Sequence, residues 1–325
     1  MILKHLLIYH KEDNDGVFSG ALIYNYFKEH LKENNIQLFG TDYNELNKLW
    51  ENREVYNWLW DFDKIIMTDI SFNDPNAMQY LYEKFGNNFF WIDHHAPIIK
   101  ESHNYKFYGC PGLRDSSNSA IVNAYKFFYK KDENYKIPEL LKVLSAWDSF
   151  TFKMEGYELE YVSKVNIGVN FMYNLDINKV IDLLRNLVVY GEESDIEANN
   201  SYITSAYNYG DIILTAKEQE NAILIENCGD FNWTVDGRKA CALFMQGAST
   251  SQIFKTVKNK VKNGIVFKRL TDGNWVISLY NANLDDTFHC GEYLKNKYNG
   301  GGHLGAAGCQ ISENQFIEIL KTHEI

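Results

Sequence analysis

Short apolar runs alternate with helix-like stretches over the first hundred residues, and this alternation constrains the fold more than any other feature of the sequence. Strands are expected at four runs, namely Leu3 to Tyr9, Ile36 to Gly40, Lys64 to Thr68 and Phe89 to Ile92. Helices are expected between them, at Val17 to Leu31 and at Asn76 to Phe85. This order predicts an α/β fold whose parallel sheet has helices on both faces and binds its ligands beyond the carboxyl ends of the strands.

The rest of the chain is expected to contain a helical stretch and then a second region of strands. The pattern is mostly helical from Ser117 to about Tyr190, and a charged helical stretch continues to Ala216. Strands are expected again at Ala222 to Glu226, Gly264 to Arg269 and Trp275 to Tyr280, with a turn at Asp272-Gly273. Because domains have roughly 100–200 residues, a chain of 325 residues that is 45% hydrophobic predicts two of them. We expect a first domain over 1–190, a helical linker over 191–215 and a smaller α/β domain over 216–325.

Charge and cysteine usage exclude some classes of protein. The formal net charge is −11, whereas a protein that covers duplex nucleic acid usually has a broad basic surface. A small phosphorylated substrate is compatible with this charge, because bound metal ions supply a local positive field. The five cysteines lie far apart, which favours reduced structural thiols over a zinc or redox motif. No run reaches the roughly 18 apolar residues of a membrane span, and the start of the chain does not resemble a signal peptide. We therefore expect a cytoplasmic protein with no membrane partner.

Side chains that can bind a metal ion follow three of the expected strands. They are His10, Asp13 and Asp15, then Asp69, and then Asp93, His94 and His95. One more acid, Asp148, lies between Trp147 and Phe150 in an apolar helical stretch, where a carboxylate needs a partner. Histidine and carboxylate ligands together suit Mn²⁺ or Mg²⁺ rather than a thiolate zinc site. Two such ions, about 3.5–4 Å apart with a shared carboxylate, can clamp an in-line displacement at phosphorus.

Taken singly, each of these groups also fits an ordinary structural role. The segment from His10 to Gly16 could be a solvated turn, and Asp69 or Ser71 could cap the next helix. The two histidines could lie in a surface loop, and Asp148 could cap a helix or form a local salt bridge. The metal interpretation depends on the whole ordered set.

The ordered set resembles motifs one to four of the DHH phosphoesterase superfamily. The matching residues are His10-x-x-Asp13-x-Asp15-Gly16, Asp69, Asp93-His94-His95 and Asp148. A distant segment, Gly300-Gly301-Gly302-His303-x-x-Ala306-Ala307-Gly308, is similar to the signature of the DHH-associated nucleic-acid-binding C-terminal domain. The resemblance covers nearly the whole chain, whose length is similar to that of the NrnA-like oligoribonuclease/phosphatases, relatives of RecJ. It implies a DHH catalytic domain over 1–190 and a substrate-binding domain over 216–325.

The resemblance implies a role for each matched residue. One metal ion would be held by His10, Asp13 and Asp69. The other would be held by Asp15, Asp69, His94 and Asp148, so that Asp69 bridges the two ions. Asp93 would act beside the ligands or tune the attacking water, and His95 would contact the scissile phosphate. The two ions would be Mn²⁺, with Mg²⁺ as the alternative.

Substrate contacts are implied for Ser117, in the small-residue segment 116–120, and for Gly300, Gly301, Gly302 and His303. The glycines would let the backbone approach a phosphate or base, although they could also form only a flexible loop. A helix that began there would add an anion site at its N-terminus. Many relatives have an arginine in the preceding strand, but the matching stretch here is Ser278-Leu279-Tyr280-Asn281. Arg238 or Arg269 could replace it, or Tyr280 could stack on a base.

These features predict a metal-dependent phosphodiesterase or exonuclease. It would hydrolyse a short single-stranded oligonucleotide or a dinucleotide to nucleoside monophosphates. Two alternatives stay open: a nucleotide monophosphatase of the kind that acts on 3′-phosphoadenosine 5′-phosphate, and a catalytically silent nucleotide-binding scaffold. An oligomer is compatible with the sequence but is not determined by it.

Overall fold

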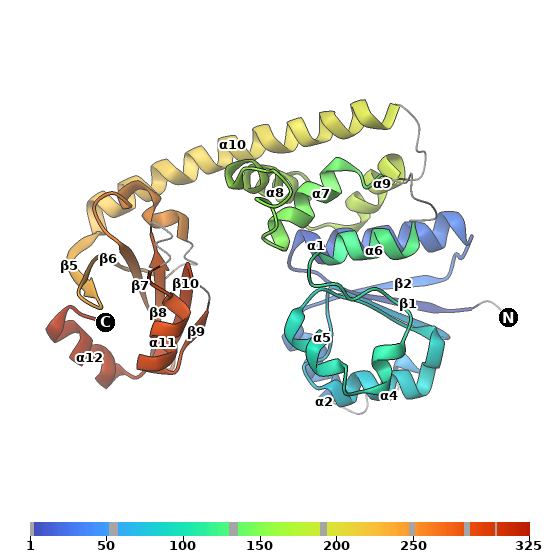
Figure 1. Ribbon diagram of the computed structural model, residues 1–325, viewed down its shortest axis with the longest axis horizontal. Coiled ribbons are helices and arrows are strands. Elements are labelled where there is room, and N and C mark those ends of the chain that lie inside the picture. Colours follow the sequence, from blue (N-terminus) through green and yellow to red (C-terminus); the bar gives the residue numbers. More distant parts are fainter. Residues whose placement is uncertain are drawn as a thin grey trace. The chain divides into compact units, whose positions relative to one another are not determined.

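The computed structural model describes residues 3–51, 58–129, 136–188, 194–246, 251–282, 287–302 and 304–325. The chain forms two compact units, Met1–Ile213 and Leu214–Ile325. The boundary between them falls inside one long helix, α10 (Ser194–Cys228) (Figure 1). Every helix within the described ranges is too short or too polar to cross a lipid bilayer.

A four-stranded parallel sheet forms the centre of the first unit. Its order is β2-β1-β3-β4, and the strands are β1 (His5–His10), β2 (Ile36–Thr41), β3 (Lys64–Thr68) and β4 (Phe89–Ile92). The register pairs His10 with Thr41, and Thr68 with both Tyr9 and Ile92, so that the carboxyl ends of all the strands lie at one edge. The predicted parallel α/β sheet is therefore confirmed.

Helices cover both faces of this sheet, as Figure 1 shows. One face packs with α1 (Asn14–Asn25), α6 (Ala120–Phe128), α7 (Glu139–Asp148), α8 (Leu159–Tyr173) and α9 (Ile177–Val188). The other packs with α2 (Tyr43–Glu51), α4 (Pro75–Phe85) and α5 (Ala96–Ser102). Successive residues of β1 alternate between the two cores, since Leu7 belongs to the first and Leu6 to the second. Both faces of β1, β3 and β4 are largely buried, which explains why these strands are mostly apolar.

Two of the predicted helices begin where a capping residue fixes them. Asp13 caps α1, which therefore starts at Asn14 and continues as a π-helix over Tyr26–His30. Asp74 caps α4, and Pro75 occupies its first turn. The cap of α4 is thus Asp74 rather than Asp69 or Ser71, which leaves Asp69 free of a capping role.

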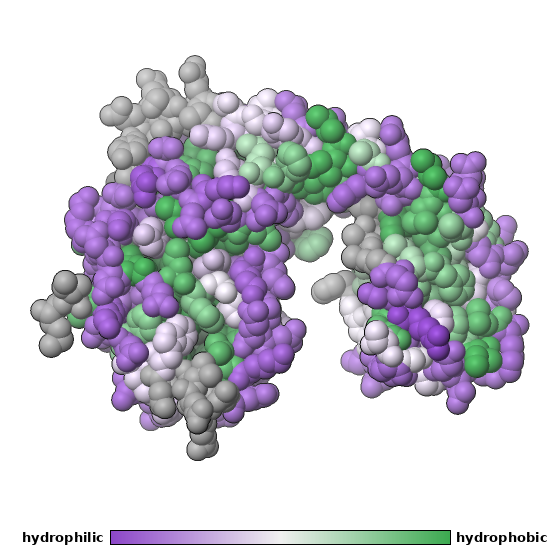
Figure 2. Space-filling view, turned by 180° about the vertical axis from the view of Figure 1, so that it is seen from behind, coloured by the Kyte–Doolittle hydropathy of each residue, from purple (hydrophilic) through white to green (hydrophobic). Residues whose placement is uncertain are grey.

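The second unit is built on a six-stranded mixed sheet of order β5-β6-β7-β8-β10-β9. Its strands are β5 (Asp230–Val235), β6 (Arg238–Phe244), β7 (Asn263–Arg269), β8 (Trp275–Asn281), β9 (Gly301–Gly302) and β10 (Ala306–Ile311). A 3₁₀ segment (Ser251–Val257) and two helices, α11 (Cys290–Tyr298) and α12 (Glu313–Thr322), complete it. On the face drawn in Figure 2, hydrophilic residues form much of the surface of each unit. A smaller second α/β domain was predicted, and this unit confirms it.

One local prediction in this region is wrong, and one condition is not met. The expected strand at Ala222 to Glu226 is the end of α10. A short apolar run does not distinguish a buried strand from a helix, and here the helix simply continues through it. The residues after the glycine run do not begin a helix either, because Ala306–Ile311 form β10, which pairs with β8 and β9.

Candidate metal centre

Side chains from distant parts of the first unit meet at the carboxyl edge of its sheet. His10 is the last residue of β1, Asp69 follows β3, and His94 and His95 follow β4. Asp148 is the last residue of α7 and comes to the same place. The backbone of Asp69 adopts the left-handed conformation, with φ of 57°, which directs its carboxylate out of the line of the strand. The structure therefore brings together all the residues that were expected to be metal ligands.

His10 defines the first group of possible ligands. Its Nδ1 lies 3.0 Å from Asp13 Oδ2 and 3.6 Å from Asp69 Oδ2. The three residues offer ligand atoms within 4.8 Å of one another. The other oxygen of Asp13, Oδ1, accepts a hydrogen bond of 2.9 Å from the Gly16 amide at the start of α1. This bond holds the Asp13 carboxylate in place beside His10.

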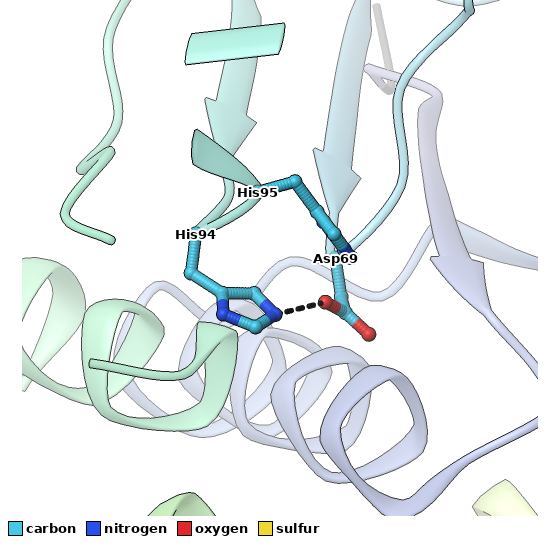
Figure 3. A group of neighbouring side chains, drawn as sticks. All are labelled: Asp69, His94 and His95. Carbon is cyan, nitrogen blue, oxygen red and sulfur yellow. Dashed lines mark ion pairs between the residues drawn. The ribbon is translucent and has the colours of Figure 1, made fainter. Parts of the chain in front are cut away.

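His94 defines the second group. Its Nε2 lies 3.2 Å from Asp148 Oδ2, 3.3 Å from Asp69 Oδ1 and 3.5 Å from Asp15 Oδ2. Asp15, His94 and Asp148 again place ligand atoms within 4.8 Å of one another. Figure 3 shows His94 directed at the Asp69 carboxylate. Since Asp69 approaches both His10 and His94, its carboxylate lies between the two groups.

The start of α6 holds Asp15. The amides of Ala120 and Ile121 donate to its two oxygens at 2.7 and 2.8 Å. These amides lie at the N-terminus of a helix, which favours a negative charge. In the preceding loop, Ser117 donates its backbone amide and its hydroxyl to Asp115 at 2.9 and 2.6 Å. The small-residue segment 116–120 was expected near the substrate. In the structure its Ala120 amide binds the Asp15 carboxylate, and Ser117 hydrogen-bonds within its own loop.

Asp93 is fully buried and belongs to neither group. Its Oδ2 accepts from the indole Nε1 of Trp91 at 2.9 Å, and its Oδ1 lies 2.7 Å from His95 Nδ1. Burial alone would raise the pKa of Asp93, but its hydrogen bonds to His95 lower it, and the Asp93 carboxylate raises the pKa of His95 against the opposite effect of burial. Asn123 donates to the Asp93 carbonyl at 3.0 Å. Asp93 therefore fixes the ring of His95, which has a ring nitrogen within 4.8 Å of ligand atoms of Asp69 and His94.

Three acids of the cluster have raised pKa values, whereas the hydrogen bond with His10 lowers the pKa of Asp13 despite its burial. Burial, with added repulsion from Asp15 and Asp69, raises the pKa of Asp148 to about 9. Burial also raises the pKa of Asp15 and Asp69. Burial alone would lower the pKa of His10, but hydrogen bonds to Asp13 and Asp69 exceed that effect and raise it to about 10. Crowded buried carboxylates of this kind bind a cation where one is available.

The chemistry of the cluster fits a pair of divalent ions. The Oδ1 atom of Asp69 is buried and has no hydrogen-bond partner among the described residues. Such an oxygen is costly to bury, and coordination to a metal would satisfy it. The ligand atoms in the described cluster are imidazole nitrogens and carboxylate oxygens, which suit Mn²⁺ or Mg²⁺. His10, Asp13 and Asp69 would hold one ion, and Asp15, Asp69, His94 and Asp148 the other.

The residues of the second unit that were expected to contact substrate differ in how exposed they are and in which side chains they contact. Gly301 and Gly302 form the exposed edge strand β9, while His303 lies outside the described residues. Tyr280 is only 7% exposed and packs near Phe254, so little of its ring is available to stack on a base. Arg269 lies 3.7 Å from Glu313, and the guanidinium of Arg238 lies over the Phe288 ring.

One residue beside the cluster was missed by the sequence analysis. Tyr43 opens α2, directly beyond the carboxyl end of β2, and its hydroxyl lies 3.4 Å from His95 Nδ1. Nothing local distinguishes it among the 22 tyrosines of the chain. The one available signal was its place after a predicted strand, where the other strands have their metal-binding groups.

Comparisons with known proteins identify a family for most of the first unit and a shared fold. Residues 5–146 match the model of the DHH family, N-terminal domain. The solved pGpG-specific phosphodiesterase PggH from Vibrio cholerae is 15% identical, with a TM-score of 0.51, and the match covers 98% of this chain and 97% of that one. The DHH domain of a member of the s1p family of ribosomal proteins is 13% identical, with a TM-score of 0.55, over 99% and 85% of the two chains.

A third solved structure, exonuclease RecJ bound to manganese, is 14% identical over 98% of this chain and 89% of that one, with a TM-score of 0.46. No curated protein sequence matches the chain. At these identities the first two structures show a shared fold, and the family match identifies the region that contains most of the cluster. Residues 5–146 of the chain are therefore a DHH family N-terminal domain.

Proposed function

We propose that the protein is a metal-dependent phosphodiesterase or exonuclease that hydrolyses short oligonucleotides or dinucleotides to nucleoside monophosphates. The observation that carries the proposal is the pair of ligand groups around Asp69, one with His10 and the other with His94. A carboxylate shared by two ligand groups is the arrangement that two-metal hydrolysis of phosphate esters requires.

The residues around the two groups would divide the work. Two divalent ions held there would activate a water molecule and neutralise charge on the phosphoryl oxygens. Asp93 orients His95 through Nδ1, and the other ring nitrogen, Nε2, would donate a hydrogen bond to the phosphoryl group. The helix α6 holds the Asp15 carboxylate in position through its first amides.

A short substrate agrees with the charge and with the second unit. A net charge of −11 gives little means of neutralising a long phosphate backbone. A Cβ built on Gly301 would meet nothing within 4 Å, so the backbone of this edge strand is open to a nucleotide. In this proposal, residues 1–190 are the catalytic domain, 191–215 a helical linker and 216–325 a substrate-binding domain. The protein acts in the cytoplasm.

The test is a screen of short DNA, short RNA, linear dinucleotides including pGpG, and cyclic dinucleotides, with Mn²⁺ added and the products identified. Wild type would be compared with Asp69→Ala and His94→Ala, and Asp61→Ala would serve as a control, because Asp61 is exposed. We expect nucleoside monophosphates from wild type and from the control, and a loss of at least about a hundredfold in the two site variants. Equal rates in all four proteins would refute the site.

The number of Mn²⁺ ions that the protein binds distinguishes this proposal from the scaffold alternative. Wild type should bind Mn²⁺ after treatment with a chelator and dialysis, and a protein that binds none would instead be a silent scaffold. Hydrolysis of 3′-phosphoadenosine 5′-phosphate without any cleavage of dinucleotides would replace the phosphodiesterase by the monophosphatase.

A further inference from the structure

Each strand of the first sheet has a polar group just beyond its carboxyl end, and β2 is the one whose group has no assigned role. His10, Asp69 and the segment 93–95 follow β1, β3 and β4. After β2 the chain reaches Tyr43 within two residues, at the first position of α2. Directly after β2, Asp42 accepts hydrogen bonds from the amides of Asn44 and Glu45, and the group that approaches the cluster is the hydroxyl of Tyr43.

The ring of Tyr43 lies beside two histidines of the cluster. Its centroid is 5.5 Å from that of His10, at an interplanar angle of 58°, and 6.0 Å from that of His95, edge-on at 88°. His10 belongs to one group of possible metal ligands, and His95 is oriented by Asp93. A phosphoryl group that reached both the metal ligands and His95 would thus pass next to Tyr43.

The hydroxyl hydrogen of Tyr43 is not accepted by His95, the histidine that it approaches. His95 Nδ1 has at most one hydrogen, and Asp93 Oδ1 accepts it at 2.7 Å, closer than the 3.4 Å to Tyr43. Protonated in this way, Nδ1 has no lone pair left to accept the phenolic proton. Among the described residues no other hydrogen-bond acceptor approaches this hydroxyl. Its proton is therefore available to a ligand.

We propose that Tyr43 binds substrate by donating its hydroxyl hydrogen to a non-bridging oxygen of the phosphoryl group, alongside His95 Nε2. This inference rests on the proposed phosphodiesterase function and adds a residue to it. A neutral donor suits this position, because another cation would compete with the metal ions for the same carboxylates. Preorganised donors aimed at developing negative charge lower the barrier of such reactions.

The test compares wild type with Tyr43→Phe, which keeps the ring and removes the donor. Tyr82→Phe is the matched control, because Tyr82 packs against the same apolar core at the side of α4. The probe is AMP, titrated calorimetrically in the presence of Mn²⁺, and Mn²⁺ binding is measured separately. We expect Tyr43→Phe to bind AMP about tenfold more weakly, while Mn²⁺ binding and the control stay as in wild type.

Kinetics on a dinucleotide give a second readout. We expect kcat to fall about 10- to 100-fold in Tyr43→Phe. With the two phosphorothioate diastereomers of the substrate, the thio effect at one oxygen should be smaller in the variant than in wild type. AMP binding equal to wild type, or thio effects unchanged at both oxygens, would overturn the role of Tyr43. Failure of the proposed function looks different: wild type would then cleave no dinucleotide, and the AMP titration would still decide on Tyr43.

Discussion

The metal cluster of the first unit and the glycine edge of the second are built in opposite ways. In the cluster, carboxylate and imidazole side chains converge, and neighbouring groups hold them, as the α6 amides hold Asp15. At β9 the relevant feature is the lack of a side chain, because Gly301 exposes bare backbone at the edge of a sheet. A substitution in the cluster therefore changes charge and coordination, whereas one at β9 changes the shape of the backbone.

The largest effect should come from Asp69→Asn, which keeps the shape of the side chain and tolerates the left-handed backbone. It removes the charge from the carboxylate that both ligand groups approach. We expect a loss of about 100- to 1000-fold in kcat/KM and a lower Mn²⁺ stoichiometry by calorimetry. A variant that still bound the wild-type number of ions would show that the two groups do not share Asp69.

Proton release should accompany metal binding at the cluster and should have no counterpart at the glycine edge. At neutral pH Asp148 and His10 hold protons, since their pKa values are about 9 and 10, and a metal must displace them. Apparent Mn²⁺ affinity should therefore rise between pH 6 and 8.5, by up to about tenfold per unit for each proton released. Calorimetry in buffers of different ionisation enthalpy measures the number of protons, and a value near zero would contradict the arrangement.

The same pKa shifts predict how the chelator-treated protein depends on pH. The native cluster keeps the proton that Asp148 loses in the unfolded chain above about pH 4, because burial raises the pKa of Asp148 to about 9, and the raised pKa values of Asp69 and Asp15 act in the same direction. The free energy of unfolding should then fall as pH rises from 6 towards 9, and the raised pKa of His10 acts in the same direction. Urea denaturation at pH 6 and 8.5 tests this sign, and added Mn²⁺ should reduce or reverse the trend.

Within the glycine edge, Gly302 and Gly301 should respond differently to alanine. Gly302 has φ of 144°, and a Cβ there would lie 2.5 Å from the Ala306 carbonyl oxygen. We expect Gly302→Ala to destabilise the second unit by about 1–3 kcal/mol. Gly301→Ala should unfold like wild type and weaken only nucleotide binding, because its Cβ would point into open space. Denaturation followed by tryptophan fluorescence separates the two, and equal stabilities would show that the β9 backbone is not constrained.

The smallest effect is expected for Ser117→Ala. The hydroxyl of Ser117 donates to Asp115 in its own exposed loop. We expect kcat/KM to stay within about threefold of wild type and the stability loss to be about 1 kcal/mol or less. A much larger loss of kcat/KM with unchanged stability would show that Ser117 contacts the substrate.

The sequence predicted the parts of the structure that depend on neighbouring residues. Strands β3 and β4 have the predicted bounds, because buried parallel strands are continuous apolar runs between polar residues. Ala222 to Glu226 looks the same locally, but its conformation is set by the helix that precedes it. Local pattern alone could not separate these cases.

The same distinction applies to the cluster. His10, Asp69 and His94 could be predicted because each stands directly after a strand. The amides that hold Asp15 come from Ala120 and Ile121, more than a hundred residues away, and no local signal connects them. Tyr43 was missed for a similar reason. Its proposed role depends on Asp93, which accepts the hydrogen of His95 Nδ1 and so leaves the Tyr43 hydroxyl without an acceptor there.

The left-handed backbone of Asp69 has a consequence for the evolution of the protein. An aspartate in this conformation, with a buried oxygen that lacks a hydrogen-bond partner among the described residues, costs the fold stability on both counts. Asp69→Gly would relieve both, so the chelator-treated variant should melt at a higher temperature than wild type although it is inactive. Selection for thermal resistance alone would thus discard this aspartate early, and its presence records selection for what the carboxylate binds.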